Sequence, residues 1–399
     1  MDMAKPIIRF KGYQDDWEQR KLGDLTEELS EYATMASGLP LLTSSRSGLM
    51  YQSDFRDRKT TTSDETLFSI VPKGSCTYRH MSDDDIFHLN INVLEKGLVS
   101  REYPVFISSE NNDLEFIIQH INSSDRFRAF CKGQKKGGTR TRLYYKTLCE
   151  FEMMIPSIEE QKKISATLHS LDYLITLHQR KCDETKRLKK YMLQKMFPQN
   201  GEKVPEIRFS GFTDDWEQRK FGEIVEKYED PVETPTEGYT RLGIRSHAKG
   251  TFHSFVEKGK ELETAKMFRV AADKFIVNIT FGWEHAVAIT DENDAGKLVS
   301  HRFPQYSFNA GMVPKFFRYL ILDENFKHHL ELSSPGGAGR NRVLKLSDML
   351  EYKMNFPSEA EQKKIAAYFD DLDHLITLHQ RELENLQNIK KFMLGKMFV

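Results

Sequence analysis

Two long segments of the chain carry the same helical pattern of apolar positions. Residues 157–197 and 358–398 contain no proline, and each begins with Ser-x-x-Glu, which predicts a capping box. Apolar residues then recur at alternating steps of four and three, the spacing of a heptad seam. At ~1.5 Å per residue, each helix would be about 60 Å long. The first seam comprises Ile164, Leu168, Leu171, Ile175, His178, Cys182, Thr185, Lys189, Met192 and Met196; the second comprises Ile365, Phe369, Leu372, Ile376, His379, Leu383, Leu386, Lys390, Met393 and Met397.

These seams predict that the two helices pack against each other as an antiparallel coiled coil, with the halves of the chain related by an approximate two-fold axis. His178 and His379 occupy the same seam position. A polar seam residue commonly fixes helix register, and we favour that role over a pH switch or a metal site. The sequence therefore predicts no bound metal.

The helices belong to a tandem repeat that spans the chain. Residues 8–24 (IRFKGYQDDWEQRKLGD) return at 207–223, and residues 156–197 are identical to 357–398 at 24 of 42 positions. The interiors diverge and mix short β-type runs, such as KFIVNIT, with polar loops. We therefore expect two α/β domains joined by the helices, without a derivable strand order.

The repeated segment that opens each half, residues 8–24 and 207–223, is called the leader below. The two leaders contribute two of the three tryptophans, Trp17 and Trp216. We expect both to anchor a domain core, with stacking on a nucleic-acid base as the alternative. The TEEL stretch that follows the first leader, residues 26–29, is predicted to be a short helix.

Composition narrows the class of protein. The 399 residues are 39% hydrophobic and 29% charged, which excludes a wholly disordered chain, and no run of ~18 apolar residues predicts a membrane span. The first residues lack the pattern of a secretory signal, and the four cysteines form no CxxC pair. These features predict a cytoplasmic protein.

Motifs of catalysis are missing from the sequence. It contains no Asn/Asp-Pro-Pro-Tyr/Phe tetrapeptide of adenine methyltransferases, no Walker A motif, no G-x-G-x-x-G fingerprint and no zinc-deaminase pattern. We therefore predict a binding protein.

Basic residues gather in one stretch although the net charge is only -1. Residues 126–146 hold eight Lys or Arg and no Asp or Glu, interleaved with aromatics, which favours contact with nucleic acid over a solvated loop. A similar Gly-Gly-then-Arg element returns in the second half. The predicted contacts are Lys132, Lys135, Lys136, Arg140 and Arg142, with Arg340, Arg342 and Lys345 in the second copy; weaker candidates are Arg56, Arg58, Lys59, Tyr78 and Arg79, and Arg241, Arg245, His247, Lys249, Trp283 and His285.

Taken together, DDWEQRKLGD, the GLVS and GGTRTRL islands, PSIEEQKKI and LDxLITLHQR, with their second copies, resemble the specificity (S) subunits of Type I restriction–modification systems, the HsdS family. The resemblance implies two α/β target recognition domains separated by two long antiparallel helices. The implied parts are target recognition domain 1 at 1–155, a central spacer helix at 156–198, a linker and target recognition domain 2 at 199–356, and a C-terminal spacer helix at 357–399.

The resemblance also implies the partners. Each domain would bind one half of a split double-stranded DNA site, while the helices set the gap and dock two methyltransferase subunits, which two restriction subunits would join. S-adenosylmethionine, ATP and Mg would lie on those partners, with no cofactor on this chain. The alternatives are a non-enzymatic coiled-coil scaffold for proteins and a self-sufficient DNA-modifying enzyme.

Overall fold

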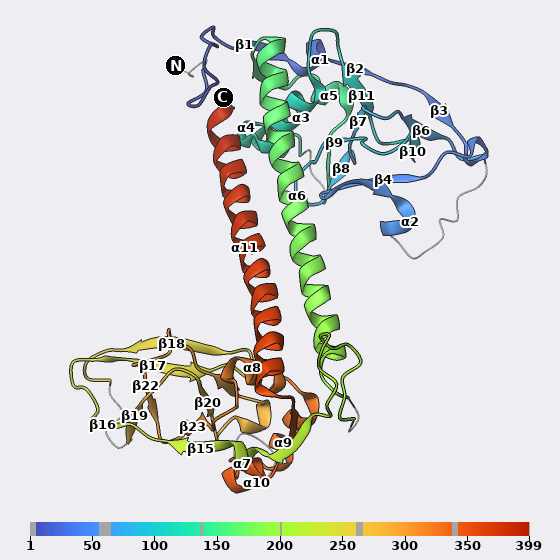
Figure 1. The fold of residues 1–399 in the computed structure, drawn as a ribbon. Coiled ribbons are helices and arrows are strands. Elements are labelled where there is room, and N and C mark those ends of the chain that lie inside the picture. The colour runs from blue at the N-terminus through green and yellow to red at the C-terminus, as the bar shows by residue number, and fades with distance from the viewer. Residues whose placement is uncertain are drawn as a thin grey trace. The chain divides into compact units, whose positions relative to one another are not determined.

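The structure, a computed structural model, describes residues 5–55, 65–135, 139–199, 202–260, 266–336 and 342–398. The chain folds into two compact units (Figure 1). The first unit is Met1–Gln179 with Gln380–Val399, and the second is Arg180–His379. Within the described residues, no helix combines the length and the apolar character that a membrane span requires.

The first unit contains a four-stranded sheet in the order β2-β11-β7-β9 and a three-stranded sheet in the order β10-β6-β3. Two-stranded ribbons β1-β13, β12-β8 and β4-β5 complete its strands. Its elements are β1 (Glu18–Lys21), α1 (Leu22–Leu25), β2 (Thr26–Glu28), β3 (Tyr32–Ala33), η1 (Met35–Ser37), β4 (Leu42–Ser45), β5 (Gly48–Tyr51), α2 (Gln52–Phe55), β6 (Phe68–Val71), β7 (Cys76–Thr77), β8 (Met81–Ser82), β9 (Asn90–Ile91), β10 (Gly97–Ser100), β11 (Val105–Ser108), α3 (Leu114–Ser123), α4 (Asp125–Gly133), β12 (Thr141–Arg142), α5 (Tyr145–Leu148), β13 (Glu152–Ile155) and the start of α6 (Ile158–Lys195).

The second unit contains a four-stranded sheet in the order β15-β23-β20-β21 and a five-stranded sheet in the order β16-β19-β22-β17-β18, beside the ribbon β14-β24. Its elements are β14 (Glu217–Lys220), α7 (Phe221–Ile224), β15 (Val225–Tyr228), β16 (Pro231–Val232), β17 (Tyr239–Ile244), β18 (Thr251–Val256), β19 (Met267–Arg269), β20 (Lys274–Val277), η2 (Gly282–Glu284), β21 (Val287–Ile289), β22 (Leu298–Ser300), β23 (Gln305–Phe308), α8 (Pro314–Leu320), α9 (Glu324–Leu332), α10 (Leu346–Leu350), β24 (Lys353–Phe356) and the start of α11 (Glu359–Met397).

The two units share one topology. The ribbon register Glu18↔Ile155 of β1-β13 recurs as Glu217↔Phe356 of β14-β24. The four-stranded sheets correspond strand for strand, and β10-β6-β3 corresponds to β22-β19-β16. The predicted tandem repeat of α/β units is thus confirmed through the interiors, where sequence similarity is lost. The hairpins also correspond, since the parallel bridge Leu41↔Leu98 brings β4-β5 to β10 as the pair Arg241↔Leu298 brings β17-β18 to β22. The ribbon β12-β8 has no counterpart among the described strands of the second unit.

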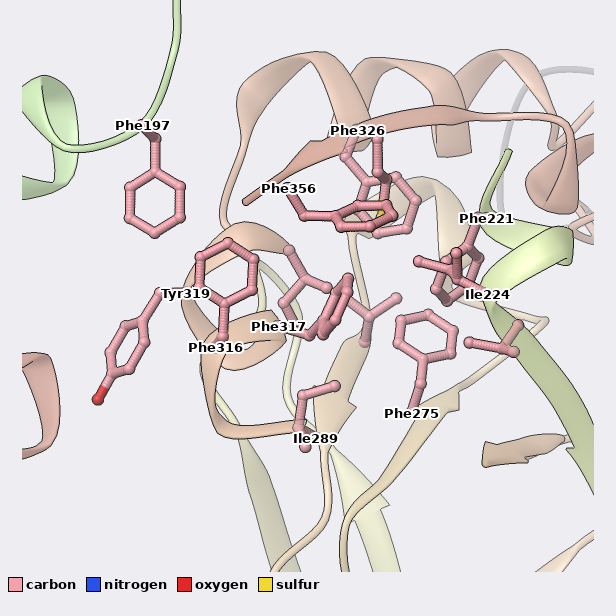
Figure 2. Packing of buried hydrophobic residues seen from close by; sticks show 14 of the residues in the cluster. Phe197, Phe221, Ile224, Phe275, Ile289, Phe316, Phe317, Tyr319, Phe326 and Phe356 are labelled. Carbon is pink, nitrogen blue, oxygen red and sulfur yellow. The ribbon is translucent and has the colours of Figure 1, made fainter. Parts of the chain in front are cut away.

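Each leader tryptophan lies in an aromatic core. Trp17 packs edge-on against Phe116 at 5.7 Å between ring centroids, and Trp216 packs against Phe316 at 5.9 Å. Both indoles are buried, so the predicted anchoring role is confirmed and base stacking is excluded for them. Figure 2 shows the core of the second unit, in which Phe197, from the end of α6, meets Phe316 at 5.7 Å.

Both seams are buried or partly buried at every position along α6 and α11. In the first unit Lys390 of α11 binds Asp172 of α6, and in the second Lys189 binds Asp373 at 2.6 Å. Within each unit the residue numbers on one helix rise as those on the other fall, so the predicted antiparallel packing is confirmed. Among the described residues no group of three or more His, Cys, Asp or Glu could hold a metal ion.

A buried ion pair joins each leader to the start of a long helix. Arg9 donates two hydrogen bonds of 2.7 Å to the carboxylate of Glu160, and Arg208 does the same to Glu361. The carboxylates are 0% and 1% exposed. The predicted capping boxes are therefore wrong in one respect, because these glutamates serve an arginine instead of the cap backbone.

The TEEL stretch was also predicted wrongly. Thr26–Glu28 is the strand β2, which pairs with β11, and the helical turn α1 precedes it at Leu22–Leu25. The tertiary pairing outweighs the helix preference of its two glutamates.

We expect Arg208→Ala to destabilise the second unit by about 3–5 kcal/mol, because it leaves the Glu361 carboxylate buried without its partner. Chemical denaturation followed by tryptophan fluorescence measures this change. The control is Arg269→Ala, which removes an exposed ion pair to Asp230 at 3.5 Å and should cost about 1 kcal/mol or less. Equal losses in both variants would contradict the assigned role of the buried pair.

Candidate nucleic-acid interface

The described residues of the basic stretch lie on and between the helix α4, the short strand β12 and the start of α5. Ser124 caps α4, and its hydroxyl accepts from the Phe127 amide at 3.2 Å, while Phe127 and Cys131 turn into the core. The strand β12 pairs with β8, which buries Thr141. The basic side chains that alternate with these buried residues reach solvent, namely Lys132, Lys135, Arg140 and Arg142.

Three consecutive carboxylates face this basic surface. Asp83 accepts from Arg140 Nε at 2.7 Å, and Asp85 lies 3.6 Å from the ammonium of Lys135. Asp84 binds Arg46, from the turn between β4 and β5. The count of eight basic to no acidic residues in the sequence overstates the local positive charge, because the fold places Asp85 and Asp83 beside Lys135 and Arg140, from 50 and 57 positions away.

A cavity of about 620 Å³ opens beside these ion pairs. Hydroxyl groups, two arginines and three carboxylates line it, so its wall offers both donors and acceptors, as the edges of DNA bases do. Arg79, one of the predicted contacts, is exposed there. The lining residues are Thr43, Ser44, Ser45, Arg46, Ser47, Arg79, His80, Met81, Ser82, Asp83, Asp84, Ile86, Phe87, His88, Ser100, Glu102 and Tyr103.

Tyr78 was a weaker candidate for nucleic-acid contact, and the structure excludes it. Its side chain is fully buried, and its hydroxyl donates to the carbonyl of Leu143 at 3.1 Å. The neighbouring His80 is also buried and stacks on Tyr144 at 5.7 Å. Burial lowers the pKa of His80, so its imidazole stays neutral near pH 7.

In the second unit the candidate surface is the hairpin β17-β18, at the edge of the five-stranded sheet. Gly243 pairs with Phe252, and the Phe252 ring occupies the space that a Cβ at Gly243 would need. The Arg245 guanidinium lies 5.4 Å from the centroid of that ring, and Arg241 Nε donates to Ser254 at 2.8 Å. One face of the hairpin therefore presents two arginines around an exposed aromatic ring.

A buried carboxylate holds this hairpin in place. Asp294, 2% exposed, accepts from Thr251 at 2.9 Å and binds Nε2 of His253 at 2.8 Å. The sequence reasoning missed Phe252, His253 and Asp294. The alternation of polar and apolar residues around the Ala-Lys-Gly turn, residues 248–250, is the signal that could have indicated a hairpin here.

The hairpin tip rests on η2. The amide of His247 donates to the carbonyl of Glu284 at 2.8 Å, and His247 and Lys249 reach solvent. Trp283 lies beneath the Arg342 guanidinium at 5.6 Å. The fold thus gathers candidates from three separate stretches of the sequence. Lys345, the residue before α10, is also exposed.

His285 was predicted, like Trp283, to contact nucleic acid, and this prediction is wrong. Its ring is 3% exposed, and Nε2 lies 2.8 Å from the carbonyl of Ile321. Burial lowers its pKa below the usual 6.5. Five further candidates lie outside the described residues: Arg56, Arg58, Lys59, Lys136 and Arg340.

Fold and surfaces define a class of protein: a tandem repeat of two α/β units on long antiparallel helices, with different polar and basic faces on a shared framework. A family model for the Type I restriction modification DNA specificity domain matches residues 86–187 and 213–388, more than half of the chain. The chain belongs to this family.

Relatives and solved structures agree with the family. The MjaVIII specificity subunit of a Type I restriction enzyme of Methanocaldococcus jannaschii is 24% identical over 66% of this chain. A putative MjaX specificity subunit from the same organism is 23% identical over 70%. The match spans 65% of each relative, just under two thirds of its length. The crystal structure of a Type I S subunit from M. genitalium has the same fold, with a TM-score of 0.58 over 99% of both chains at 13% identity.

The lowered pKa of His285 predicts an acid-sensitive second unit. Since the folded-state pKa lies below 6.5, the unfolded chain binds more protons just below that pH. Stability therefore falls as the pH drops through 6.5. His285→Asn should flatten this dependence between pH 7.5 and 5, as measured by denaturant midpoints. His301→Asn is the control, because His301 is exposed and is not among the groups that shift the pKa of His285, and it should keep the wild-type slope.

Proposed function

We propose that this chain is the DNA-specificity subunit of a Type I restriction–modification complex, in which each unit reads one half of a bipartite double-stranded DNA site. The observation that carries the proposal is the contrast between a shared framework and two different exposed faces. In a chain of the specificity family, that contrast suits two readers for two unlike half-sites. Residues 1–155 and 199–356 are the proposed target recognition domains, and 156–198 and 357–399 are the proposed spacer helices.

Catalysis is assigned to the partners in this proposal. Methyltransferase subunits would supply S-adenosylmethionine, and restriction subunits would supply ATP with Mg. The chain itself would act in the cytoplasm as a non-catalytic reader, by placing those subunits on DNA.

The hairpin β17-β18 is the proposed reader in the second unit. A two-stranded ribbon fits the major groove, where arginine can bind O6 and N7 of guanine together. Arg241 lies on β17 and Arg245 directly follows that strand, four residues on. At the rise of an extended chain this is about 13 Å, which is roughly four base-pair steps. Exposed lysines such as Lys132 of the first unit would bind phosphates, which position the protein without carrying sequence information.

Arg241→Ala and Arg245→Ala should each relax one base position in one half-site and leave the other half-site unchanged. Loss of a bidentate contact is worth about 1–3 kcal/mol of discrimination. The measurement is the methylation motif in cells that express the chain with its methyltransferase partner. Arg219→Ala, which removes an arginine of the separate ribbon β14-β24 that pairs with Glu217, should keep the wild-type motif. An active complex with an unaltered motif in both hairpin variants would contradict the proposed reader.

The long helices carry the proposed methyltransferase sites. In the first unit Tyr173 and Phe392 are 65% and 56% exposed, beside the ion pair of Asp172 with Lys390. The repeat offset of 201 places Tyr191 in the second unit at the position equivalent to Phe392. Repeated exposed apolar positions suit two copies of one partner. The exposed apolar residues on α6 and α11 are Tyr173, Leu174, Leu188, Tyr191, Leu375, Leu378, Ile389 and Phe392.

Replacing Tyr173 and Phe392 together by serine should weaken capture of the methyltransferase subunit about tenfold or more, since aromatic anchors dominate such interfaces. Co-purification with the tagged subunit measures this. The control Val93→Ser removes a 69% exposed apolar residue away from the helices and should leave capture intact. Unchanged capture by the double variant would place the docking surface elsewhere.

A further inference from the structure

We propose that Asp83 and Asp84 are specificity determinants of the first unit, which compete with DNA phosphates for Arg140 and Arg46 and so weaken binding to DNA that offers only its backbone. This inference rests on the proposed DNA-reading function and deepens it. It concerns carboxylates, which sequence reasoning did not select.

The geometry sets one carboxylate against each cation. Asp83 binds Arg140 at 2.7 Å, and Asp84 binds Arg46. Asp85 holds the loop, since it accepts from the Thr141 hydroxyl and adopts a φ of 63°, a conformation that non-glycine residues rarely take. The positive φ of Asp85 turns the backbone at the end of this loop. Asp83 and Asp84 each form an ion pair with a different arginine.

Exposure separates the roles of the three carboxylates. The side chains of Asp83 and Asp84 are 66% and 42% exposed, whereas that of Asp85 is 18% exposed. Asp83 and Asp84 also line the 620 Å³ cavity. The Ser82 hydroxyl, which donates to Asp84 at 2.8 Å, and Arg46 lower the pKa of that carboxyl, so it stays charged at neutral pH. Both carboxylates therefore stand on the face where the proposed DNA would approach.

Electrostatics gives these charges a selective effect. Non-specific affinity comes from neutralised phosphates and released counterions, so each arginine held by a carboxylate is withheld from that contact. When a phosphate displaces the carboxylate, the freed negative charge repels it. A cognate groove offsets this cost where the carboxylate accepts from an amino group of cytosine or adenine. Backbone-only binding has no such compensation.

The test compares Asp83→Asn/Asp84→Asn with the wild-type chain, each assembled with its methyltransferase partner. A matched control, Asp16→Asn/Glu150→Gln, removes two exposed carboxylates of the same unit that pair with Lys5 and Lys21, outside the basic stretch. Fluorescence anisotropy gives the affinity for a duplex of unrelated sequence and for a duplex that contains the methylation motif, over a series of salt concentrations.

The test variant should bind unrelated DNA about tenfold more tightly than wild type, with a salt slope steeper by about two, the contribution of two freed arginines. Its affinity for cognate DNA should rise less, and the control should change both affinities about twofold or less. Equal gains in test variant and control, or equal gains on both duplexes, would overturn the inference while leaving DNA reading intact. Wild-type protein that binds neither duplex would overturn the proposed function itself.

Discussion

The buried arginine–glutamate pair at the start of each long helix is the constraint on which the rest of each unit depends. Glu160 and Glu361 are buried at the first turn of α6 and α11, where Arg9 and Arg208 neutralise them. An uncompensated carboxylate there would be strongly destabilising. The ion pair therefore holds the leader in one position against the start of the long helix. From that position the leader enters the ribbon that pairs it with β13 or β24 and places its tryptophan in the core.

The same junction explains why the ends of the chain belong together. In the second unit the amide of Ile207 donates to the carbonyl of Lys195, at the end of α6. In the first unit Ile8 donates to Lys396, at the end of α11, and Phe398 packs against Phe116 at 5.5 Å. The core of the first unit is therefore completed by the last helical residues of the chain. A first unit defined by contiguous sequence alone would lack part of its own core.

Sequence predicted the features that repeat and missed those that depend on contacts distant along the chain. The seams, the antiparallel helices and the two buried tryptophans follow from periodicity and from the similarity of the two leaders. Strand order did not follow, because the interiors share a topology without sharing residues. The excess of basic residues in 126–146 was misleading, since a count along the chain cannot include Asp83, which binds Arg140 from 57 positions away. Tyr78 and His285 look like polar readers in sequence and are core residues in the fold.

The net charge of -1 takes on a different meaning once charges are placed in space. A protein that must find one site among very many competitors is limited by its ratio of specific to non-specific affinity rather than by total attraction to phosphate. Basic residues are needed to bind the phosphate backbone of DNA. Without nearby carboxylates, however, they bind the backbone of every DNA sequence equally. Carboxylates set beside them lower that shared attraction and leave base contacts to decide. A nearly neutral chain with paired surface charges is therefore compatible with DNA reading, and its arrangement favours discrimination over affinity.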